Sequence, residues 1–312
     1  MTASAREVSA APRSSPGSRF LAWVANPWGK ARFLWVIAIA YVLWTLLPVA
    51  IAVVFSFNAT RALTAWQGFS TRWYVGDVSS VWNDPELHAA LSQSLKLSGL
   101  VVLIAVPLGV AFALALDRWR GRGSGTANFV MLFSFITPEI AIAVALLLFF
   151  TRVFTTVGLG FSAQVLGVSM YMMAYPVIIV RARLLSIGAD YEEAAMDLGA
   201  SPIQALRRVL LPLLFPAIFA SIAIVFAATI DNFVISQQLS ANAADQTIPI
   251  LIYSAARHGA LPSVNALATL TLTASTILIV IAVLIYRRST RGEAGGAGLT
   301  GIGLPGAAAE HA

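Results

Sequence analysis

The sequence contains no cysteine, and its 312 residues include only three histidines, His88, His258 and His311. Without cysteine there can be no disulfide, no thiol catalysis and no cysteine-ligated metal site. The histidines are far apart in the sequence, so we predict no histidine metal site either. Charge is also scarce: charged residues make up 11% of the chain, against about 25% in an average soluble domain.

A further absence concerns nucleotide hydrolysis. The sequence has no G-x-x-x-x-G-K-[ST] motif, the glycine-rich loop whose backbone N–H groups hold the phosphates of a nucleotide. We therefore do not expect this chain to hydrolyse ATP by itself. We predict no catalytic residue in it and no cofactor of its own.

Apolar residues are abundant instead. They form 58% of the chain and give a mean hydropathy of +0.81, whereas a soluble domain is about 45–50% apolar. This composition predicts that the protein is embedded in a lipid bilayer. The isoelectric point near 10.1 is typical of nucleic-acid-binding domains. However, the basic residues lie at the ends of apolar runs and form no patch, so no nucleic-acid partner is expected.

Six stretches are long enough to cross a bilayer, which takes roughly 20 apolar residues in a helix. They are residues 33–57, 97–116, 127–150, 161–180, 209–230 and 259–286. Only the third contains a charged residue, Glu139, and Asp231 follows the end of the fifth. We predict an all-α membrane protein with six transmembrane helices.

The loops between these stretches differ in their content of Lys and Arg, which predicts the orientation. With a cytoplasmic N-terminus, four of these residues lie outside, Arg61, Arg72, Arg152 and Arg257, and Lys96 lies at the outer edge of the second span. The inner segments then hold the other fifteen: Arg6, Arg13, Arg19, Lys30, Arg32, Arg118, Arg120, Arg122, Arg181, Arg183, Arg207, Arg208, Arg287, Arg288 and Arg291. Both termini are therefore predicted to be cytoplasmic.

The segments outside the spans have distinct compositions. Residues 1–32 and 287–312 are predicted to be disordered cytoplasmic tails, because they are rich in small and polar residues. The span at 33–57 is too long for a cleavable signal and ends without a small-residue cleavage site. In the outer loop, aromatic residues are predicted to lie at the lipid headgroups, with contact to an external partner as the alternative: Trp66, Trp73, Tyr74 and Trp82.

The inner loop before the fifth span, residues 190–212, has two helix-start signals. Asp190 and Glu193 have the spacing of a capping box, and Gly199 is placed to end the short helix that follows. Ser201 and Pro202 then fit the N-cap and first position of a second helix. Local signals alone predict a helix–turn–helix at the inner face of the membrane. An ordinary cytoplasmic loop with two capped helices would show the same signals.

The residue spacing in this loop is more specific. Glu193-Ala194-Ala195, followed by three residues, Gly199, nine residues, and Val209-x-Leu211-Pro212, resembles the EAA loop of ABC-importer permeases. The motif has Ile where this chain has Val209. The resemblance identifies this chain as a permease of the type I ABC importer fold. It implies a core of five helices over residues 91–286, with the helix at 33–57 outside this core.

The resemblance implies a set of partners and roles. The loop would be a coupling helix that docks on a separate ABC ATPase dimer, which binds ATP and Mg²⁺, with Glu193 as a polar contact and Gly199 as the turn. Ala194, Ala195, Leu211 and Pro212 complete the coupling residues. A second permease subunit and an extracytoplasmic substrate-binding protein would complete a multi-pass assembly in the bacterial inner membrane.

Other segments resemble the second permease of spermidine/putrescine importers. They are Pro138-Glu139-Ile140, residues 191–201, Asp231-Asn232-Phe233-Val234 and Asn265-Ala266-Leu267. Where that family commonly has Asp-Asp-Phe, this chain has Asn232 in place of one carboxylate. The resemblance implies a polyamine as cargo. Relatives of the same architecture carry aminoethylphosphonate, thiamine or ferric iron.

Charged side chains at membrane depth are costly and usually face a polar path. The candidates here are acidic, Glu139 and Asp231, so a cationic cargo is expected. Asn232, which follows Asp231 in the sequence, is a further candidate for the path, and Tyr171 and Tyr175 are possible cation–π faces. The alternatives are structural: Glu139 could satisfy N–H groups freed by Pro138, Asp231 could lie in water, and the tyrosines could pack. A secondary transporter or a membrane scaffold protein are the other classes of function, although no inverted repeat is evident.

Overall fold

The computed structural model describes residues 32–61, 65–118, 121, 123–258 and 262–297. Within these ranges the chain is helical, with no strand beyond an isolated bridge between Asn58 and Phe69. The chain divides into two parts, one ending at Ala52 and one beginning at Val53. The all-α prediction is confirmed.

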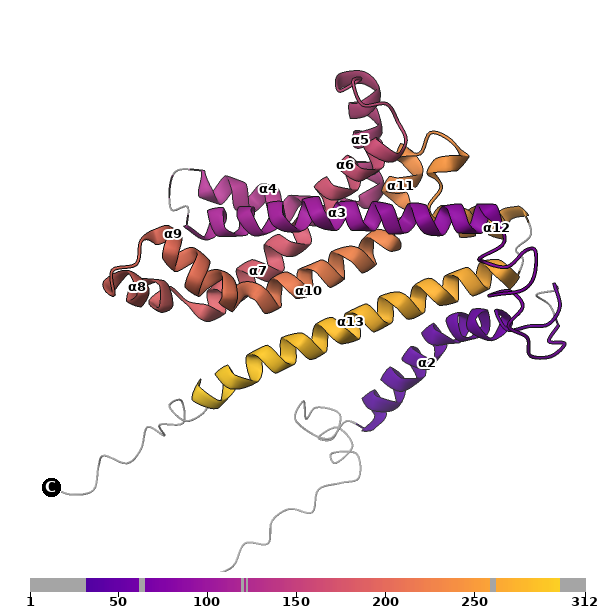
Figure 1. Ribbon diagram of the computed structural model, residues 1–312, viewed down its shortest axis with the longest axis horizontal. Helices are drawn as coiled ribbons and strands as arrows, with labels where there is room; N and C mark the ends of the chain where they lie inside the picture. Colours follow the sequence, from indigo (N-terminus) through magenta and orange to yellow (C-terminus); the bar gives the residue numbers. More distant parts are fainter. Residues whose placement is uncertain (1–31, 62–64, 119–120, 122, 259–261, 298–312) are drawn as a thin grey trace, which may run out of the picture. The chain divides into compact units, whose positions relative to one another are not determined.

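The first part contains all but the last turn of helix α2 (Arg32–Phe55), which matches the predicted span at 33–57 (Figure 1). It is apolar on all sides and none of its span-forming window is buried within the chain. A helix that is hydrophobic all round is buried in a larger assembly or in a membrane. The tail predicted before it, up to residue 31, lies outside the described residues.

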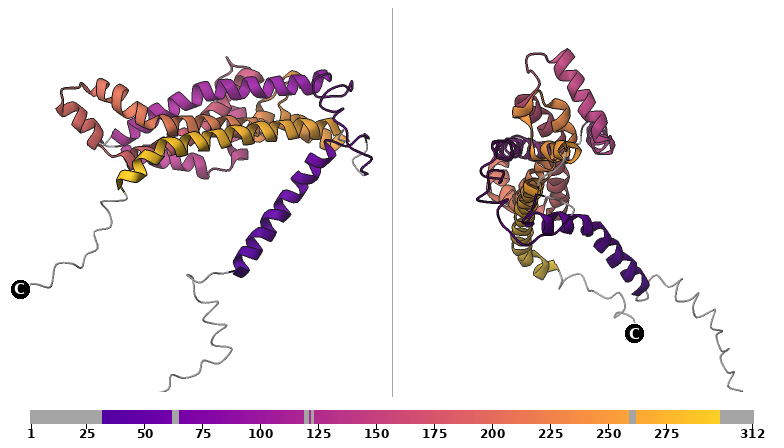
Figure 2. Two further views of the ribbon diagram at one scale, coloured as in Figure 1. Left: turned by 60° about the horizontal axis from the view of Figure 1, so that its bottom comes forward. Right: turned by 90° about the vertical axis from the view of Figure 1, so that its right-hand side faces the viewer.

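The second part is built around four helices: α3 (Pro85–Arg118), α6 (Phe161–Met172), α7 (Ala174–Ile187) and α10 (Leu211–Ile230). Helix α3 packs against the other three, and buried Val, Leu, Ala and Met side chains from all four form one core. Helix α13 (Pro262–Ala297) lies alongside α10 (Figure 2). It continues past residue 286, so the helix is longer than the predicted sixth span, and the rest of the predicted tail, 298–312, lies outside the described residues.

Helices α3 and α7 approach each other closely at Gly109, which is buried on α3. A β-carbon built at Gly109 would lie 2.9 Å from the carbonyl oxygen of Met173 and closer still to the ring of Pro176. Small residues let membrane helices approach in this way. The absence of a side chain at Gly109 therefore sets the separation of two helices of the core.

We expect Gly109→Ala to destabilise the protein by about 1–3 kcal/mol, the usual cost of overpacking a tight site. Gly99 is the matched control on the same helix, because a β-carbon there would meet nothing within 4 Å. The thermal unfolding midpoint of each purified variant in detergent is the measurement. Gly99→Ala should leave the midpoint unchanged or raise it, and an equal fall in both variants would contradict the packing argument.

The third predicted span is broken. It forms α4 (Ser124–Ile136), α5 (Glu139–Leu148) and the π-helix η1 (Phe149–Val153), with Thr137 and Pro138 in extended conformation between the first two. Pro138 has no N–H for the helix ladder, and the residue before a proline avoids the α region. Five helical spans of sufficient length are therefore present among the described residues, and the third of the six predicted spans is divided into two shorter helices.

The loop after α2, which was predicted to lie outside, is folded. Trp73 is fully buried in a second apolar cluster with Val81 and Leu87, and its indole N–H donates to the carbonyl of Asn58 at 2.6 Å. The prediction that it lies at the headgroups is therefore wrong for Trp73, because its polar atom has a partner inside the protein. Trp66 and Trp82 remain about half exposed, as that prediction requires.

Two interactions hold the exposed side of this loop. The Arg72 guanidinium contacts the Asp77 carboxylate at 3.0 Å and lies 4.4 Å from the centre of the Trp73 ring. The backbone N–H of Ser79 donates to Asp77 and, ahead of the charge of Arg72, holds the pKa of this carboxyl below its usual value. The loop therefore keeps this ion pair in mildly acidic surroundings and loses it only as the pH falls through that lowered pKa.

Candidate functional site

The loop that was predicted to be cytoplasmic begins with helix α8 (Asp190–Asp197), where a short helix was predicted. Ala189 is its N-cap, with its carbonyl accepting from the N–H groups of Glu192 and Glu193 at 3.0 and 3.1 Å. The expected Asp190 cap is therefore wrong, since Asp190 is already the first helical residue. The glycine turn is as predicted: Gly199 has φ +88°, and its N–H donates to the carbonyl of Met196 at 2.9 Å.

A second helical segment follows the turn. Ser201 and Gln204 form a reciprocal capping box around α9 (Pro202–Ala205), with distances of 3.3 and 2.9 Å, and Pro202 stands at its start. The π-helix η2 (Leu206–Leu210) then leads into α10, which begins with Leu211 and Pro212. Sequence reasoning anticipated the cap but not the π-turn, which has no simple sequence signature.

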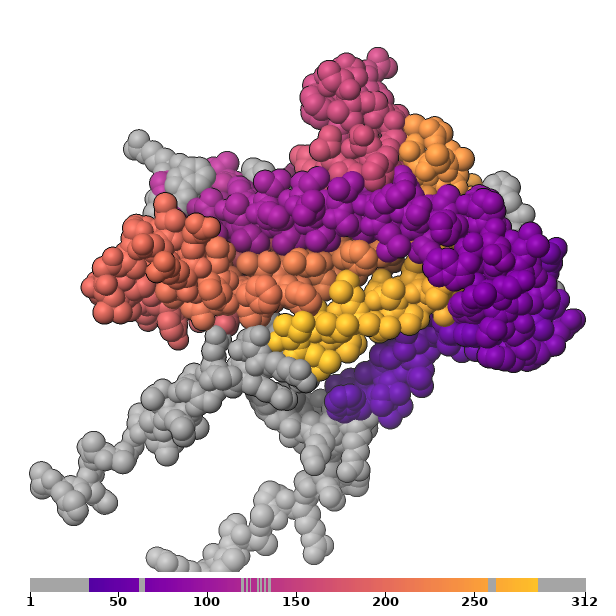
Figure 3. All heavy atoms as spheres, viewed as in Figure 1, coloured from indigo at the N-terminus to yellow at the C-terminus, as the bar shows by residue number. Residues whose placement is uncertain are grey.

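The side chains of α8 are on the surface. The helix has no buried residue, and Glu193 and Ala194 are exposed while Ala195 is partly covered. Large apolar side chains are exposed beside them: Tyr191, Met196, Leu198 and Ile203. Together α8 and α9 make up the surface at one end of the second part (Figure 3). Exposed apolar patches rimmed by polar residues mark interaction sites.

A second set of predicted residues comes together at the broken span. Asn232 is buried after the end of α10, and its side-chain N–H donates to Glu139 Oε1 at 2.6 Å. The Asn232 Oδ1 atom accepts from the backbone N–H and the hydroxyl of Ser236 at 3.2 and 3.1 Å. These bonds fix which side of the amide faces Glu139. They join α5 to α11 (Val234–Leu239), which pack together.

Asp231 takes no part in the hydrogen bonds of this pair, although it precedes Asn232 in the sequence. It is exposed at the C-terminal end of α10, beside a hollow of about 430 Å³ whose other walls include Phe233, Ile252 and Tyr253. The rings of Phe233 and Tyr253 are 4.8 Å apart, and the guanidinium of Arg257 lies 4.7 Å from the Tyr253 ring. Tyr253 is on α12 (Ile248–His258), and sequence reasoning missed it.

The two predicted tyrosines lie near each other at the α6–α7 junction. Tyr171 and Tyr175 are both half-buried and pack against the core, and Glu139 and Tyr175 are the titratable neighbours of Tyr171. Tyr171 also borders an apolar hollow of about 590 Å³ that reaches Thr137 and Ile142 on either side of the helix break. Both tyrosines therefore pack against the core, and Tyr171 is also within electrostatic range of the Glu139 carboxylate.

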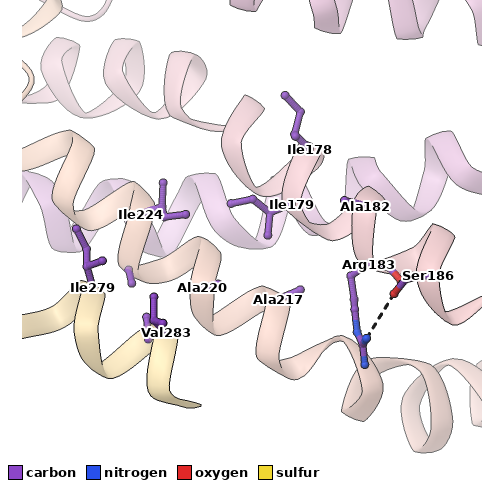
Figure 4. A pocket seen from close by; sticks show the side chains of 12 residues that line it. Ile178, Ile179, Ala182, Arg183, Ser186, Ala217, Ala220, Ile224, Ile279 and Val283 are labelled. Carbon is purple, nitrogen blue, oxygen red and sulfur yellow. Dashed lines mark hydrogen bonds between the residues drawn. The ribbon is translucent and has the colours of Figure 1, made fainter. Parts of the chain in front are cut away.

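A separate groove of about 480 Å³ runs between α7, α10 and α13 (Figure 4). Its walls are alanines and branched aliphatic residues, with Arg183 at one end. The guanidinium of Arg183 donates to the carbonyl of Leu213 at 3.3 Å and to the Ser186 hydroxyl at 3.4 Å. No predicted site residue lines this groove, so its chemistry is distinct from that of the acidic residues.

No cluster of three or more His, Asp or Glu side chains able to hold a metal occurs in the part of the chain that the structure describes. Charged and polar groups are instead divided between an exposed helical loop at one end of α10 and a carboxylate–amide pair near its other end. Several long apolar helices connect these regions. This arrangement is that of a helical membrane protein with polar groups at both ends of α10.

The comparisons with known proteins identify the family. The chain belongs to the binding-protein-dependent transport system inner membrane component family, whose model matches residues 105–292. It is 32% identical over 249 residues to the spermidine/putrescine transport system permease protein PotC of Escherichia coli K12, covering 80% of this chain and 92% of that protein. It is also 32% identical to the putrescine transport system permease protein PotI of that organism, covering 78% and 87%.

Solved structures agree on the fold. A bacterial ABC transporter that imports the acidic polysaccharide alginate has a TM-score of 0.63 at 18% identity, covering 83% of this chain and 96% of that one. An amino acid ABC transporter has a TM-score of 0.52 at 23% identity, covering 69% and 99%. This chain is therefore a multi-pass permease subunit of an ABC importer, a membrane component of a transporter and not a catalyst by itself.

Proposed function

We propose that this permease imports a polyamine such as putrescine or spermidine. The observation that carries the proposal is the pair formed by Glu139 and Asn232, in which a carboxylate is held in place by an oriented amide inside an apolar helix bundle. An ionised carboxylate at membrane depth attracts a cation and repels an anion. The similarity to PotC and PotI, whose names specify spermidine and putrescine, supports the same cargo.

The proposal assigns the path as follows. Asp231, beside Phe233 and Tyr253, receives the cation at the outer end of α10, and Glu139 with Asn232 lies further along. Tyr171, whose charged neighbour is Glu139, and the nearby Tyr175 offer aromatic faces along the path. Carboxylates and aromatic faces both bind ammonium groups, and aliphatic side chains suit the methylene segments between them.

The proposal also includes the partners. The exposed α8–α9 surface, with Glu193, Ala194, Ala195 and Gly199, docks on a separate ATPase dimer that binds ATP and Mg²⁺. A second permease completes the path and an external binding protein delivers the cargo. The excess of Lys and Arg on the α8–α9 side supports cytoplasmic termini and a location in the bacterial inner membrane.

The test is uptake in cells that carry or lack this chain together with its partner subunits. Radiolabelled putrescine and spermidine should accumulate only with the chain and only while ATP is present. Purification of the intact complex should retain an ATPase. Uptake that survives ATP depletion but collapses with the ion gradient would replace the proposal by a secondary transporter. ATP-driven uptake of an anion such as aminoethylphosphonate, with none of a polyamine, would overturn the choice of cargo.

A further inference from the structure

Helix α8 lies between two glycines in the left-handed region of backbone conformation. Gly188 precedes it with φ +75° and Gly199 follows it with φ +88°, conformations that residues with a side chain rarely adopt. A β-carbon at either glycine would meet nothing within 4 Å. Since α8 has no buried residue either, apolar packing does little to fix its position on the rest of the protein.

A side-chain contact links α8 to a distant part of the chain. Arg118, the last residue of α3, forms an ion pair with Glu192 on α8, with Nη2 donating to Oε1. The Glu192 side chain is 19% exposed, although its neighbour Glu193 on the same helix is exposed. The two residues are 74 positions apart in the sequence, so the contact depends on the tertiary fold.

Arg118 is the last residue of α3, which is the central helix of the bundle. Helix α3 packs against α6, α7 and α10, whereas α8 reaches α10 through α9 and η2. Movement of α8 can reach the bundle through the backbone on either side, by Gly188 to α7 and by η2 to α10. The Arg118–Glu192 pair adds a direct link to α3.

The energy of the pair decides what it can do. A partly exposed ion pair contributes only weakly to the free energy of unfolding, so the fold does not depend on it. That small free energy is enough to favour one position of α8 over another, because α8 has little apolar packing of its own. An equilibrium between two positions responds to small differences in free energy.

We propose that the Arg118–Glu192 pair is a latch that positions α8 against α3, so that movement of α8 drives α3 together with α10. The latch rests on the proposed docking of α8 on an ATPase. Arg118 and Glu192 are positioning residues in this proposal and contact neither cargo nor nucleotide. Without the latch, α8 would still dock, but part of its movement would be lost at the two glycines.

The experiment measures uptake of putrescine per ATP hydrolysed by the complete complex in proteoliposomes. Arg118→Gln and Glu192→Gln should each lower this ratio by about fivefold, within the usual range of coupling free energies, while the ATPase still co-purifies. The charge-swapped double variant Arg118→Glu with Glu192→Arg should restore the ratio to within about twofold of the original. Asp117→Asn is the matched control, because it removes one charge at an exposed position next to Arg118 on α3, outside the α8–α9 surface, and should leave the ratio unchanged.

The outcomes separate the latch from the function on which it rests. If the unaltered complex retains no ATPase, the proposed docking fails and the latch with it. If the unaltered complex works and both single variants keep the full ratio, only the latch is overturned. Loss of ATPase binding in the single variants without rescue by the swap would also overturn it, because the two residues would then belong to the docking surface itself.

Discussion

Replacement of Gly199 should lower ATP-driven uptake in an order set by backbone strain alone. Gly199 has φ +88° and open space around it, so a new side chain meets no neighbour and only the conformation opposes it. The left-handed region costs about 1–2 kcal/mol for residues with a side chain, and less for asparagine. We expect Gly199→Ala to lower uptake about tenfold, Gly199→Val to lower it further, and Gly199→Asn to lower it least.

The control is Gly158, which is exposed, has open space around it and does not have a positive φ. Gly158→Ala and Gly158→Val should leave uptake unchanged. Initial uptake rates at equal amounts of membrane-inserted protein are the measurement. If asparagine at position 199 were as damaging as valine, the loss would come from the new side chain at the docking surface and the turn geometry would not be the cause.

Removal of the charge at Glu139 should abolish most uptake of a cationic cargo. Glu139→Gln keeps an oxygen that can accept from Asn232, so the contact that is 2.6 Å in the structure survives while the charge is lost. A hydrogen bond to a charged group contributes about 1.5–3 kcal/mol. We therefore expect the uptake of putrescine to fall at least about tenfold, measured as initial rate against concentration.

Asn232→Asp is the complementary change at the same site. It would place a second carboxylate within hydrogen-bond distance of Glu139, and two like charges at such a separation repel strongly. Uptake should fall at neutral pH and recover partly as the pH is lowered and the two groups share a proton. Unaltered uptake in both Glu139→Gln and Asn232→Asp would show that this pair lies outside the path.

Local signals predicted local structure well. Ser201 and Pro202 start α9 as expected, because a cap depends on residues three positions apart. The same reasoning missed by one residue at Asp190, where the backbone carbonyl of Ala189 provides the helix start without a side-chain cap. Pro138 was recognised as a source of freed N–H groups, yet the helix is broken there outright.

Contacts between distant segments could not be predicted. Glu139 and Asn232 are 93 positions apart, and both were selected for their chemistry without any expectation that they touch. Ser236 was missed, although its spacing of four residues from Asn232 is that of one helical turn. Trp73 was misplaced for a related reason: composition identifies an aromatic residue but does not reveal the Asn58 carbonyl that receives its N–H.

The break in the third span also bears on how long a cargo stays. Glu139 is the first residue of α5, where the positive end of the helix dipole partly offsets its charge, and Asn232 donates to it from the other side. A path conducts only if its sites are favourable enough to enter and weak enough to leave. The attraction of the Glu139 carboxylate for a cation is thus weakened before any cargo arrives. A polyamine should therefore bind at this site weakly and leave it quickly.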